Sequence, residues 1–298
     1  MLPVNPNKTV IIIAGPTAVG KTQAAIELAT HLSTEIISAD SRQCFKELHI
    51  GVARPSEAEL EKIPHHFIAS HSVHDEVNAV VFEQYALAKL ELLFEQHDTV
   101  IMVGGTGLYI RAFCEGLDEI PAIDPAIRET ITSEYALKGL TWLQEKVRDA
   151  DPAFYASGEI QNPQRLIRAL EVNMGTGQSV LKFRKNRKSD RPFAIRKYGL
   201  QLPREELIRN INHRVDTMME KGLLAEVKNL VALRHLNALQ TVGYTELFDY
   251  IDNKVSLEQA IEQIMINTRQ YAKRQMTWFK KDPDITWLEP GKIMEIVG

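Results

Sequence analysis

The sequence predicts an α/β fold in which a parallel sheet is covered by helices on both faces and a helical insertion interrupts the core. Short apolar runs such as Thr9–Ala14 lack polar alternation, which is typical of strands buried on both faces. These runs alternate with segments of helical period, which favours parallel pairing. Strand signals stop after about Gly116, and the pattern to Met174 is helical. We therefore expect a core of residues 1–116 and 190–298, with residues 117–189 as the insertion.

The strands are predicted where β-branched and other apolar residues run together and then meet a turn residue. The first run ends at Gly15, the second at Asp40 and the third at a pair of glycines. A fourth strand follows a basic connection, and a last one follows the longest helix. The expected strands are Thr9–Ala14, Glu35–Ala39, Thr99–Val103, Phe193–Leu202 and Asp284–Leu288.

The helices are predicted from apolar spacing and from residues that suit helix starts. Ser256 with Gln259 forms a capping box, and Ser56 suits an N-cap. Asp151-Pro152 and Asn162-Pro163 mark helix starts inside the insertion. The expected core helices are Lys21–Leu32, Glu57–Lys62, Val80–Glu95, Glu205–Leu233 and Ser256–Lys281.

Composition favours an ordinary globular chain. Of its 298 residues, 44% are apolar and 25% are charged, and no stretch has the length and apolar content of a membrane span. The two cysteines, Cys44 and Cys114, form no CxxC pair, which indicates reduced thiols and gives no zinc signal. We therefore expect a cytoplasmic protein without a membrane partner, and a monomer is the default expectation.

Charge is unevenly distributed although the net charge is only −4. Leu181–Arg204 holds nine basic residues and one acidic residue, and Asn267–Lys281 holds five basic residues and none acidic. Two basic segments on an acidic body could form a surface for a polyanion such as RNA. The alternative is solvated surface charge without a partner.

GPTAVGKT, at Gly15–Thr22, follows a strand and opens a helix, and it matches the phosphate-binding loop pattern G-x-x-x-x-G-K-[ST]. Glycines let successive backbone amides face phosphate oxygens, and the helix adds the positive end of its dipole. The Lys21 side chain supplies a positive charge, and the Thr22 hydroxyl suits Mg²⁺. The motif therefore predicts a P-loop NTPase-like core that binds phosphate.

Nucleotide hydrolysis does not follow from that loop. A P-loop NTPase usually ends another core strand with an aspartate that holds magnesium. Here the third strand ends in Gly104, Gly105 and Thr106, and the acid follows the second strand at Asp40. Asp40 is predicted either to organise a metal or to act as a base toward the substrate in the crevice at the strand ends. The alternative is a helix N-cap.

The combination of motifs along the chain resembles the tRNA dimethylallyltransferases, also called tRNA isopentenyltransferases. The resemblance runs from Val10 to about Trp287 and depends on the order of its motifs more than on any one of them. The motifs are GPTAVGKT, ISADSRQ (37–43), HIGVARP (49–55), PHH (64–66), VGGTGLY (103–109), PQRLIRALEV (163–172), VGYTEL (242–247) and TRQYAKRQMTWFK (268–280).

The resemblance implies transfer of a dimethylallyl group from dimethylallyl diphosphate to the exocyclic amine of the adenosine 3′ of the anticodon in tRNA, with Mg²⁺ assisting and diphosphate leaving. Gly15, Pro16, Thr17, Ala18, Val19, Gly20, Lys21 and Thr22 would hold the donor diphosphate, with Thr22 as the metal ligand. The predicted catalytic residues are Asp40 as acceptor of the amine proton, Thr106 near the bridging oxygen and Arg214 on the diphosphate. For Thr106 the alternative is a helix cap, and for Arg214 an ion pair with Asp216 or Glu220.

The predicted partner is the tRNA anticodon stem-loop. Its target base must leave the stack to reach a donor bound deep in the loop, which calls for basic and stacking side chains along a groove. For Trp278 the alternative is core packing. The residues predicted from charge and helical spacing to bind tRNA are Gln164, Arg165, Arg168, Lys273, Arg274, Trp278 and Lys280, with Arg269 in the same helical stripe as Lys273. The resemblance to the family implies that Asp40, Ser41, Arg42, Gln43 and Arg128 also meet the tRNA.

Two positions depart from the family pattern. Val19 stands where serine is frequent, and Val52 replaces the usual threonine, which removes a hydroxyl near the tRNA-facing segment. Three other functions stay open from the residues alone: a small-molecule kinase with Arg165 and Arg168 as lid arginines, an RNA-binding switch without catalysis, and prenylation of free adenine nucleotides. The missing strand-end acid counts against the kinase, and the basic last helix counts against the free nucleotide.

Overall fold

The computed structural model describes residues 8–185 and 188–297 and divides them into two compact units. Unit 1 comprises Met1–Glu115 with Asp190–Gly298, and unit 2 is Gly116–Ser189. Within the described residues, no helix combines the length and apolar content that crossing a bilayer requires.

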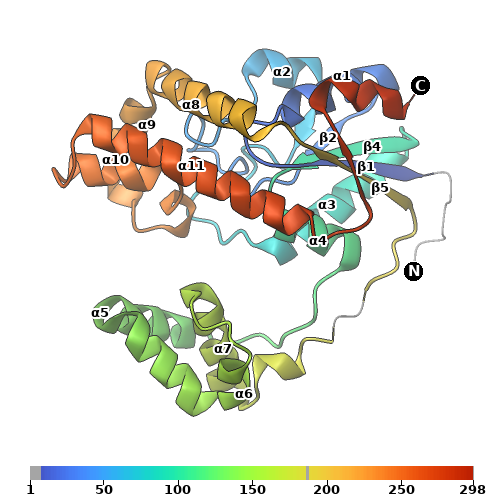
Figure 1. The fold of residues 1–298 in the computed structure, drawn as a ribbon. Helices are drawn as coiled ribbons and strands as arrows, with labels where there is room; N and C mark the ends of the chain where they lie inside the picture. The colour runs from blue at the N-terminus through green and yellow to red at the C-terminus, as the bar shows by residue number, and fades with distance from the viewer. Residues whose placement is uncertain (1–7, 186–187, 298) are drawn as a thin grey trace. The chain divides into compact units, whose positions relative to one another are not determined.

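Unit 1 is built on a parallel sheet whose described strands follow the order β3-β2-β4-β1-β5-β6 (Figure 1). Each strand pair in this sheet is parallel, and β1 lies between β4 and β5. The predicted α/β fold class with a P-loop-like core is therefore confirmed. The strands are β1 (Thr9–Ala14), β2 (Ile36–Ser38), β3 (His65–His66), β4 (Thr99–Gly104), β5 (Ala194–Leu200) and β6 (Ile285–Leu288).

Helices cover both faces of this sheet, which explains the unbroken apolar strands. Ile11 and Ile13 of β1 pack with α1 and with the last 3-10 helix in one buried cluster. The helices α3 and α4 lie on the opposite face (Figure 1). The helices of this half are α1 (Lys21–Leu32), α2 (Glu57–Lys62), α3 (Ala79–Phe94) and α4 (Gly107–Glu115), and the 3-10 helix is Pro290–Ile296.

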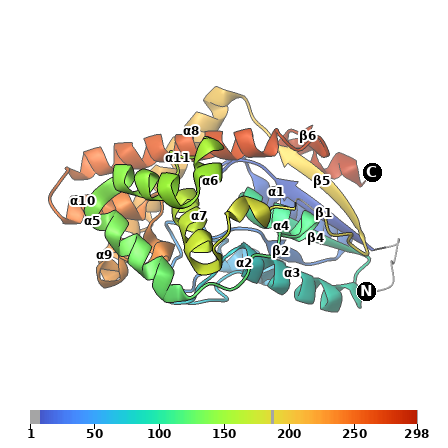
Figure 2. The same cartoon turned by 90° about the horizontal axis from the view of Figure 1, so that it is seen from below.

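The C-terminal helices of unit 1 flank the carboxyl ends of the strands. Helices α8 and α11 contact each other and run side by side (Figures 1 and 2). They bring two long helical faces toward the strand ends where the phosphate loop begins. The helices are α8 (Arg204–Glu220), α9 (Leu223–Asn229), α10 (Tyr244–Ile251) and α11 (Leu257–Phe279), with 3-10 turns at Val231–Leu233 and Asn237–Leu239.

The prediction of one helical stretch over Glu205–Leu233 is wrong. Helix α8 ends at Glu220, and α9 starts after Gly222, whose φ of 97° lies in the left-handed region that favours glycine. The capping box of Ser256 with Gln259 is confirmed at the start of α11. Helices α4 and α10 and the two-residue strand β3 are absent from the predicted elements, because each is too short to show a clear period.

Unit 2 is helical and has its own buried core, in which Leu143, Phe154 and Leu166 are fully buried. Asp124, Asp151 and Asn162 each cap a helix whose next residue is proline, which confirms the two predicted starts at Asp151-Pro152 and Asn162-Pro163. Its elements are α5 (Pro125–Ala150), α6 (Pro152–Ala156), α7 (Pro163–Thr176) and a 3-10 turn at Val180–Lys182.

Candidate active site

The loop between β1 and α1 has the backbone that the glycine pattern predicts. Gly15, Ala18 and Gly20 have φ values of 145°, 62° and 97°. A Cβ at Gly15 would lie 2.7 Å from the carbonyl oxygen of Leu200 at the end of β5, so only glycine fits there. No described side chain caps the N-terminus of α1. Its first amides are therefore available to an anion.

The order β2-β4-β1 places three strand ends beside one another at the edge of this loop. Asp40 follows β2, and Gly105 and Thr106 follow β4. A Cβ at Gly104 would lie 2.2 Å from the Ala39 carbonyl oxygen, so glycine allows the two strand ends to approach closely. The Ala39 carbonyl also accepts a hydrogen bond of 3.2 Å from the Thr106 amide. The acid and the glycine-threonine turn therefore form one edge.

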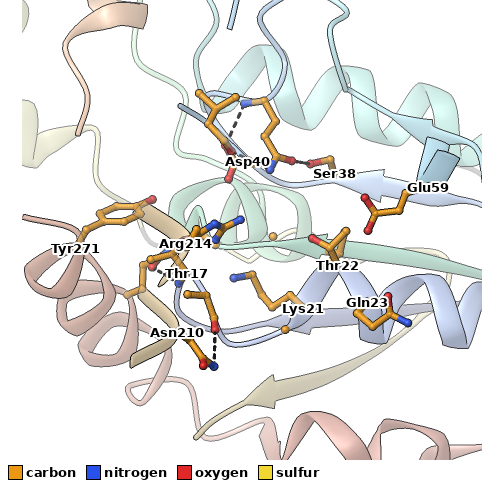
Figure 3. Close-up of a pocket in the computed structure, with 18 residues that line it drawn as sticks. Thr17, Lys21, Thr22, Gln23, Ser38, Asp40, Glu59, Asn210, Arg214 and Tyr271 are labelled. Carbon is orange, nitrogen blue, oxygen red and sulfur yellow. Dashed lines mark hydrogen bonds between the residues drawn. The ribbon is translucent and has the colours of Figure 1, made fainter. Parts of the chain in front are cut away.

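A cavity of about 380 Å³ opens between these strand ends, the loop and helices α8 and α11 (Figure 3). Both apolar and polar groups face it. The lining residues are Thr17, Ala18, Gly20, Lys21, Thr22, Gln23, Ser38, Asp40, Gln43, Val52, Glu59, Val103, Gly104, Gly105, Asn210, Arg214, Tyr271 and Gln275. Of the predicted loop residues, Gly15, Pro16 and Val19 support the turn without lining the cavity, and Val19 is buried.

Two cationic side chains reach this cavity. The Lys21 ammonium donates a hydrogen bond of 2.6 Å to the Pro16 carbonyl, and the Arg214 Nη1 donates one of 2.9 Å to the Thr17 hydroxyl. Burial lowers the pKa of Lys21 to about 7; the Arg214 charge lowers it too, and Asp40 opposes both. Burial also lowers the pKa of Arg214, again against Asp40. Two desolvated cations without a full counter-charge form a strong site for a polyanion.

Arg214 thus faces the cavity from α8 (Figure 3), and the alternative of a surface ion pair with Asp216 or Glu220 is not what the structure has. Asn210, one turn earlier on α8, donates 3.4 Å to the Ala18 carbonyl. Helix α8 therefore approaches the phosphate loop through two polar side chains on one face.

Asp40 has two structural roles at once. Its Oδ1 accepts hydrogen bonds of 2.8 Å from the Arg42 amide and 3.1 Å from the Gln43 amide, so it stabilises its own turn. Its carboxyl group also points into the cavity (Figure 3). No helix begins after Asp40 in this described part of the chain, so the alternative of a helix N-cap is wrong: the carboxylate closes a turn and also faces the cavity.

The Thr106 hydroxyl faces the neighbouring turn and does not line the cavity. It accepts 3.0 Å from the Ser41 amide and donates 3.3 Å to the Ser41 hydroxyl. Burial raises the pKa of the Tyr271 phenol to about 12, and the neighbouring Thr106 side chain opposes that rise. Thr106 therefore lies beside the Asp40 turn and does not line the cavity.

Gln275 is a buried polar residue of α11 that sequence reasoning did not select. Its Oε1 accepts 2.8 Å from the Thr17 amide, and its Nε2 donates 2.9 Å to the Gly105 carbonyl. Tyr271 and Glu59 also line the cavity and were not selected. The spacing of Tyr271, Gln275 and Trp278 along one helical face is the signal that could have found the first two.

The segment His49–Pro55 is fixed by a carboxylate that is distant in sequence. Glu226 of α9 accepts from the backbone amides of His49, Ile50 and Gly51 at 3.2, 2.7 and 3.1 Å. Gln43 holds the other side, donating 3.2 Å to the Val52 carbonyl. Val52, which is apolar where the family pattern has a hydroxyl, is one of the residues that line the cavity.

The exposed side of α11 carries a shallow groove of about 230 Å³, lined by Lys273, Arg274, Thr277, Trp278 and Lys281. Trp278 is 38% exposed, and its ring also packs on Gly107. The side chain is therefore partly packed against the protein and partly open to solvent. Arg274 lies 5.8 Å from the Tyr271 ring centroid. Lys280 is exposed at the end of the helix and does not line the groove.

Arg269 does not join Lys273 in an exposed basic stripe as predicted. Its guanidinium donates 2.9 Å to the Asn212 Oδ1 of α8, so it joins the two helices. The basic segment Leu181–Arg204 is also partly internal, because Arg191 pairs with Glu83 at 2.6 Å and Lys197 with Asp282 at 2.7 Å. Arg187 of that segment lies outside the described residues. The expected polyanion surface is therefore smaller than the charge count indicates.

In unit 2 the predicted tRNA-binding arginines already have acidic partners. Glu171 is buried and pairs with Arg128 at 3.0 Å and with Arg168 at 3.1 Å. Gln164 accepts 3.4 Å from Arg128, and Arg165 pairs with Glu159. Each arginine remains partly exposed, so its remaining donors can still reach a phosphate.

The family to which this chain belongs follows from its similarity to known proteins. The model of the IPP transferase family matches residues 43–282. The chain belongs to the IPP transferase family. The curated tRNA dimethylallyltransferase of Christiangramia forsetii is 48% identical over 279 residues, with 94% of this chain and 92% of the relative covered. That of Cytophaga hutchinsonii is 44% identical, with 97% and 95% covered.

Solved IPP transferases have the same architecture. The crystal structure of the full-length tRNA isopentenylpyrophosphate transferase of Bacillus halodurans is 34% identical, covers 97% of this chain and 94% of its own, and has a TM-score of 0.71. A eukaryotic dimethylallyltransferase, described as acting on tRNA, is 27% identical with a TM-score of 0.77 and coverage of 95% and 74%. The resemblance to tRNA dimethylallyltransferases is therefore confirmed.

Proposed function

We propose that this chain transfers a dimethylallyl group from dimethylallyl diphosphate to the exocyclic amine of the adenosine 3′ of the anticodon in tRNA, releasing diphosphate. The observation that carries the proposal is the cavity in which a phosphate loop, two desolvated cations and Asp40 meet, while β4 ends in glycines. This set of groups suits release of an anion beside a base.

The leaving diphosphate would be held by the loop amides, Lys21 and Arg214. An allylic diphosphate ionises easily, so most of the catalytic effect comes from stabilising the departing charge and aligning the amine. Lys21 and Arg214 approach from different elements, α1 and α8, and both have incomplete charge compensation in the free cavity. A bound diphosphate would supply the missing negative charge.

The oxygen atoms at the cavity fit Mg²⁺. The hydroxyl of Thr22 and the carboxylate of Glu59 both line it, and hard oxygen ligands are the ones magnesium prefers. Within the described residues no group of three acidic, histidine or cysteine side chains forms a metal cluster. Thr22 would therefore hold an ion that takes its other ligands from water and diphosphate, as is usual for magnesium at phosphates. When bound, the ion would neutralise charge on the leaving group.

Asp40 is the proposed acceptor of the amine proton. An aromatic exocyclic amine is barely basic, so a base helps most while the new carbon–nitrogen bond is forming. The hydrogen bonds that Oδ1 accepts from two backbone amides hold the carboxyl group in its direction toward the cavity. We propose that Thr106 and Tyr271, which lie next to Asp40, form the wall of the space between the donor and the acceptor.

The RNA would meet the protein at the groove of Lys273, Arg274, Trp278 and Lys281 and at the arginines of unit 2. An exposed indole beside cations suits a stacked base and its phosphates. A monomer that acts in the cytoplasm is part of the same proposal.

The test is to incubate the protein with Mg²⁺, dimethylallyl diphosphate and unmodified tRNA, digest the RNA and weigh the nucleosides. Adenosine heavier by one dimethylallyl group supports the proposal. No such nucleoside, together with turnover of ATP, would contradict it.

A further inference from the structure

The contacts of α11 with the β4–α4 turn extend over three consecutive residues. Gln275 donates to the carbonyl of Gly105, Tyr271 lies beside Thr106, and the Trp278 ring lies against Gly107. Residues 271, 275 and 278 share one helical face, since they are four and three positions apart. One side of α11 therefore follows the turn that carries Thr106.

Gln275 differs from its two neighbours because it also reaches the phosphate loop. Its amide connects the Thr17 N–H, at 2.8 Å, with the Gly105 carbonyl, at 2.9 Å. Both partners are backbone groups with one fixed role, a donor and an acceptor, so they set the orientation of the amide. Gln275 is 7% exposed although it lines the cavity, so most of its surface is covered by protein.

Glycine at position 105 is required by this contact. A Cβ there would lie 2.2 Å from Nε2 of Gln275. The Thr17 amide donates its hydrogen bond to Gln275 at 2.8 Å, and the Thr17 hydroxyl accepts one from Arg214 at 2.9 Å. The position of Thr17 is thus determined by α11 on one side and α8 on the other.

We propose that Gln275 is a positioning residue for prenyl transfer, which holds the phosphate loop and the Thr106 turn at the separation that aligns donor with acceptor. This proposal rests on the proposed function. It gives Gln275 a role in aligning the two loops, which is separate from binding RNA and from touching the donor. The helix that offers Lys273 and Arg274 to RNA thereby also fixes the leaving-group site through its buried face.

Loss of the amide should affect the chemical step more than RNA binding. In Gln275→Met, similar in size, Thr17 and Gly105 lose their common partner, and the loop can shift relative to the turn. We expect kcat to fall about 100-fold, since small misplacements of reacting groups have effects of that order. The Kd for inorganic diphosphate should rise roughly tenfold because the loop is less well organised. The Kd for tRNA should stay within about threefold, because the exposed groove is unchanged.

A second variant and a control separate positioning from loss of folding. Gln275→Glu keeps an acceptor for the Thr17 amide but cannot donate to Gly105 when ionised, so it should show the same fall in kcat with normal side-chain volume. Gln263→Met makes the same chemical change on the exposed side of the same helix and should match the wild type. The three variants are compared by circular dichroism and thermal melting before kinetics.

The measurements are steady-state transfer to tRNA, and calorimetry with inorganic diphosphate alone. A fall in kcat with unchanged tRNA affinity in both Gln275 variants supports the inference. Wild-type kcat in either folded variant, or parallel losses of tRNA and diphosphate binding, would overturn it. If the wild type binds diphosphate but transfers no prenyl group, the proposed function fails, while the diphosphate comparison still decides whether Gln275 organises the loop.

Discussion

Replacing Lys21 by arginine should remove a pH dependence from donor binding. Burial holds the pKa of Lys21 near 7 in the free cavity, with a further lowering by Arg214. A bound diphosphate would place negative charge beside the ammonium and raise that pKa again. Binding therefore takes up a proton when the free protein has lost it, and a rising pH must weaken binding. Arginine stays charged throughout this range.

The size of the effect follows from the pKa. With a pKa of about 7, ~90% of free Lys21 is charged at pH 6 and ~10% at pH 8. Above pH 7.5, the Kd for dimethylallyl diphosphate should rise by up to ~10-fold per pH unit, or about 1.4 kcal/mol, until the pKa of the bound state is reached.

The assay is isothermal titration of dimethylallyl diphosphate without tRNA at pH values from 6 to 9, in two buffers of different ionisation enthalpy. The donor's own phosphate titration is common to both proteins and cancels in the comparison. The wild type should take up about one more proton than Lys21→Arg at pH 8. Equal slopes of log Kd against pH in the two proteins would show that Lys21 does not lose its proton near pH 7 in the free site.

Three other changes test separate parts of the structure. Asp40→Asn should abolish transfer while tRNA affinity stays within about threefold, since an amide oxygen can still accept from the turn; filter binding showing an equal loss of affinity would make Asp40 structural. Neutralising Lys273 and Arg274 together should flatten the salt slope of tRNA binding by roughly one unit per lost phosphate contact, and an unchanged slope would place the RNA elsewhere. Gly104→Ala should destabilise folding by about 1–3 kcal/mol in urea titration, because its Cβ would meet the Ala39 carbonyl; wild-type stability would show that β2 and β4 can separate.

The parts of the fold that local sequence determines were predictable. The apolar run of β1 and the glycines of the loop specify a strand and a turn within a few residues of themselves. Asp40 could be placed at the crevice because the carboxyl ends of parallel strands meet at one edge. The caps of α6 and α7 were likewise readable from their Asp-Pro and Asn-Pro pairs.

The parts that depend on distant contacts were not predictable. Gln275 is one polar residue among several in a basic helix, and its task appears only when α11 lies across Thr17 and Gly105. Glu226 looks like a surface acid until its carboxylate meets three amides more than 170 residues away in sequence. Charge counts likewise could not show that Arg191 is used inside the fold.

In the proposed reaction, the phosphate loop holds a leaving diphosphate while a carbon–oxygen bond breaks, and no phosphoryl group is transferred. Dimethylallyl diphosphate labelled with ¹⁸O at the bridging oxygen tests it directly, with mass spectrometry of both products after reaction with tRNA. All the label should be found in the released diphosphate, and adenosine should carry the prenyl group through nitrogen. Label retained in dimethylallyl alcohol, or a phosphate added to the RNA, would contradict it.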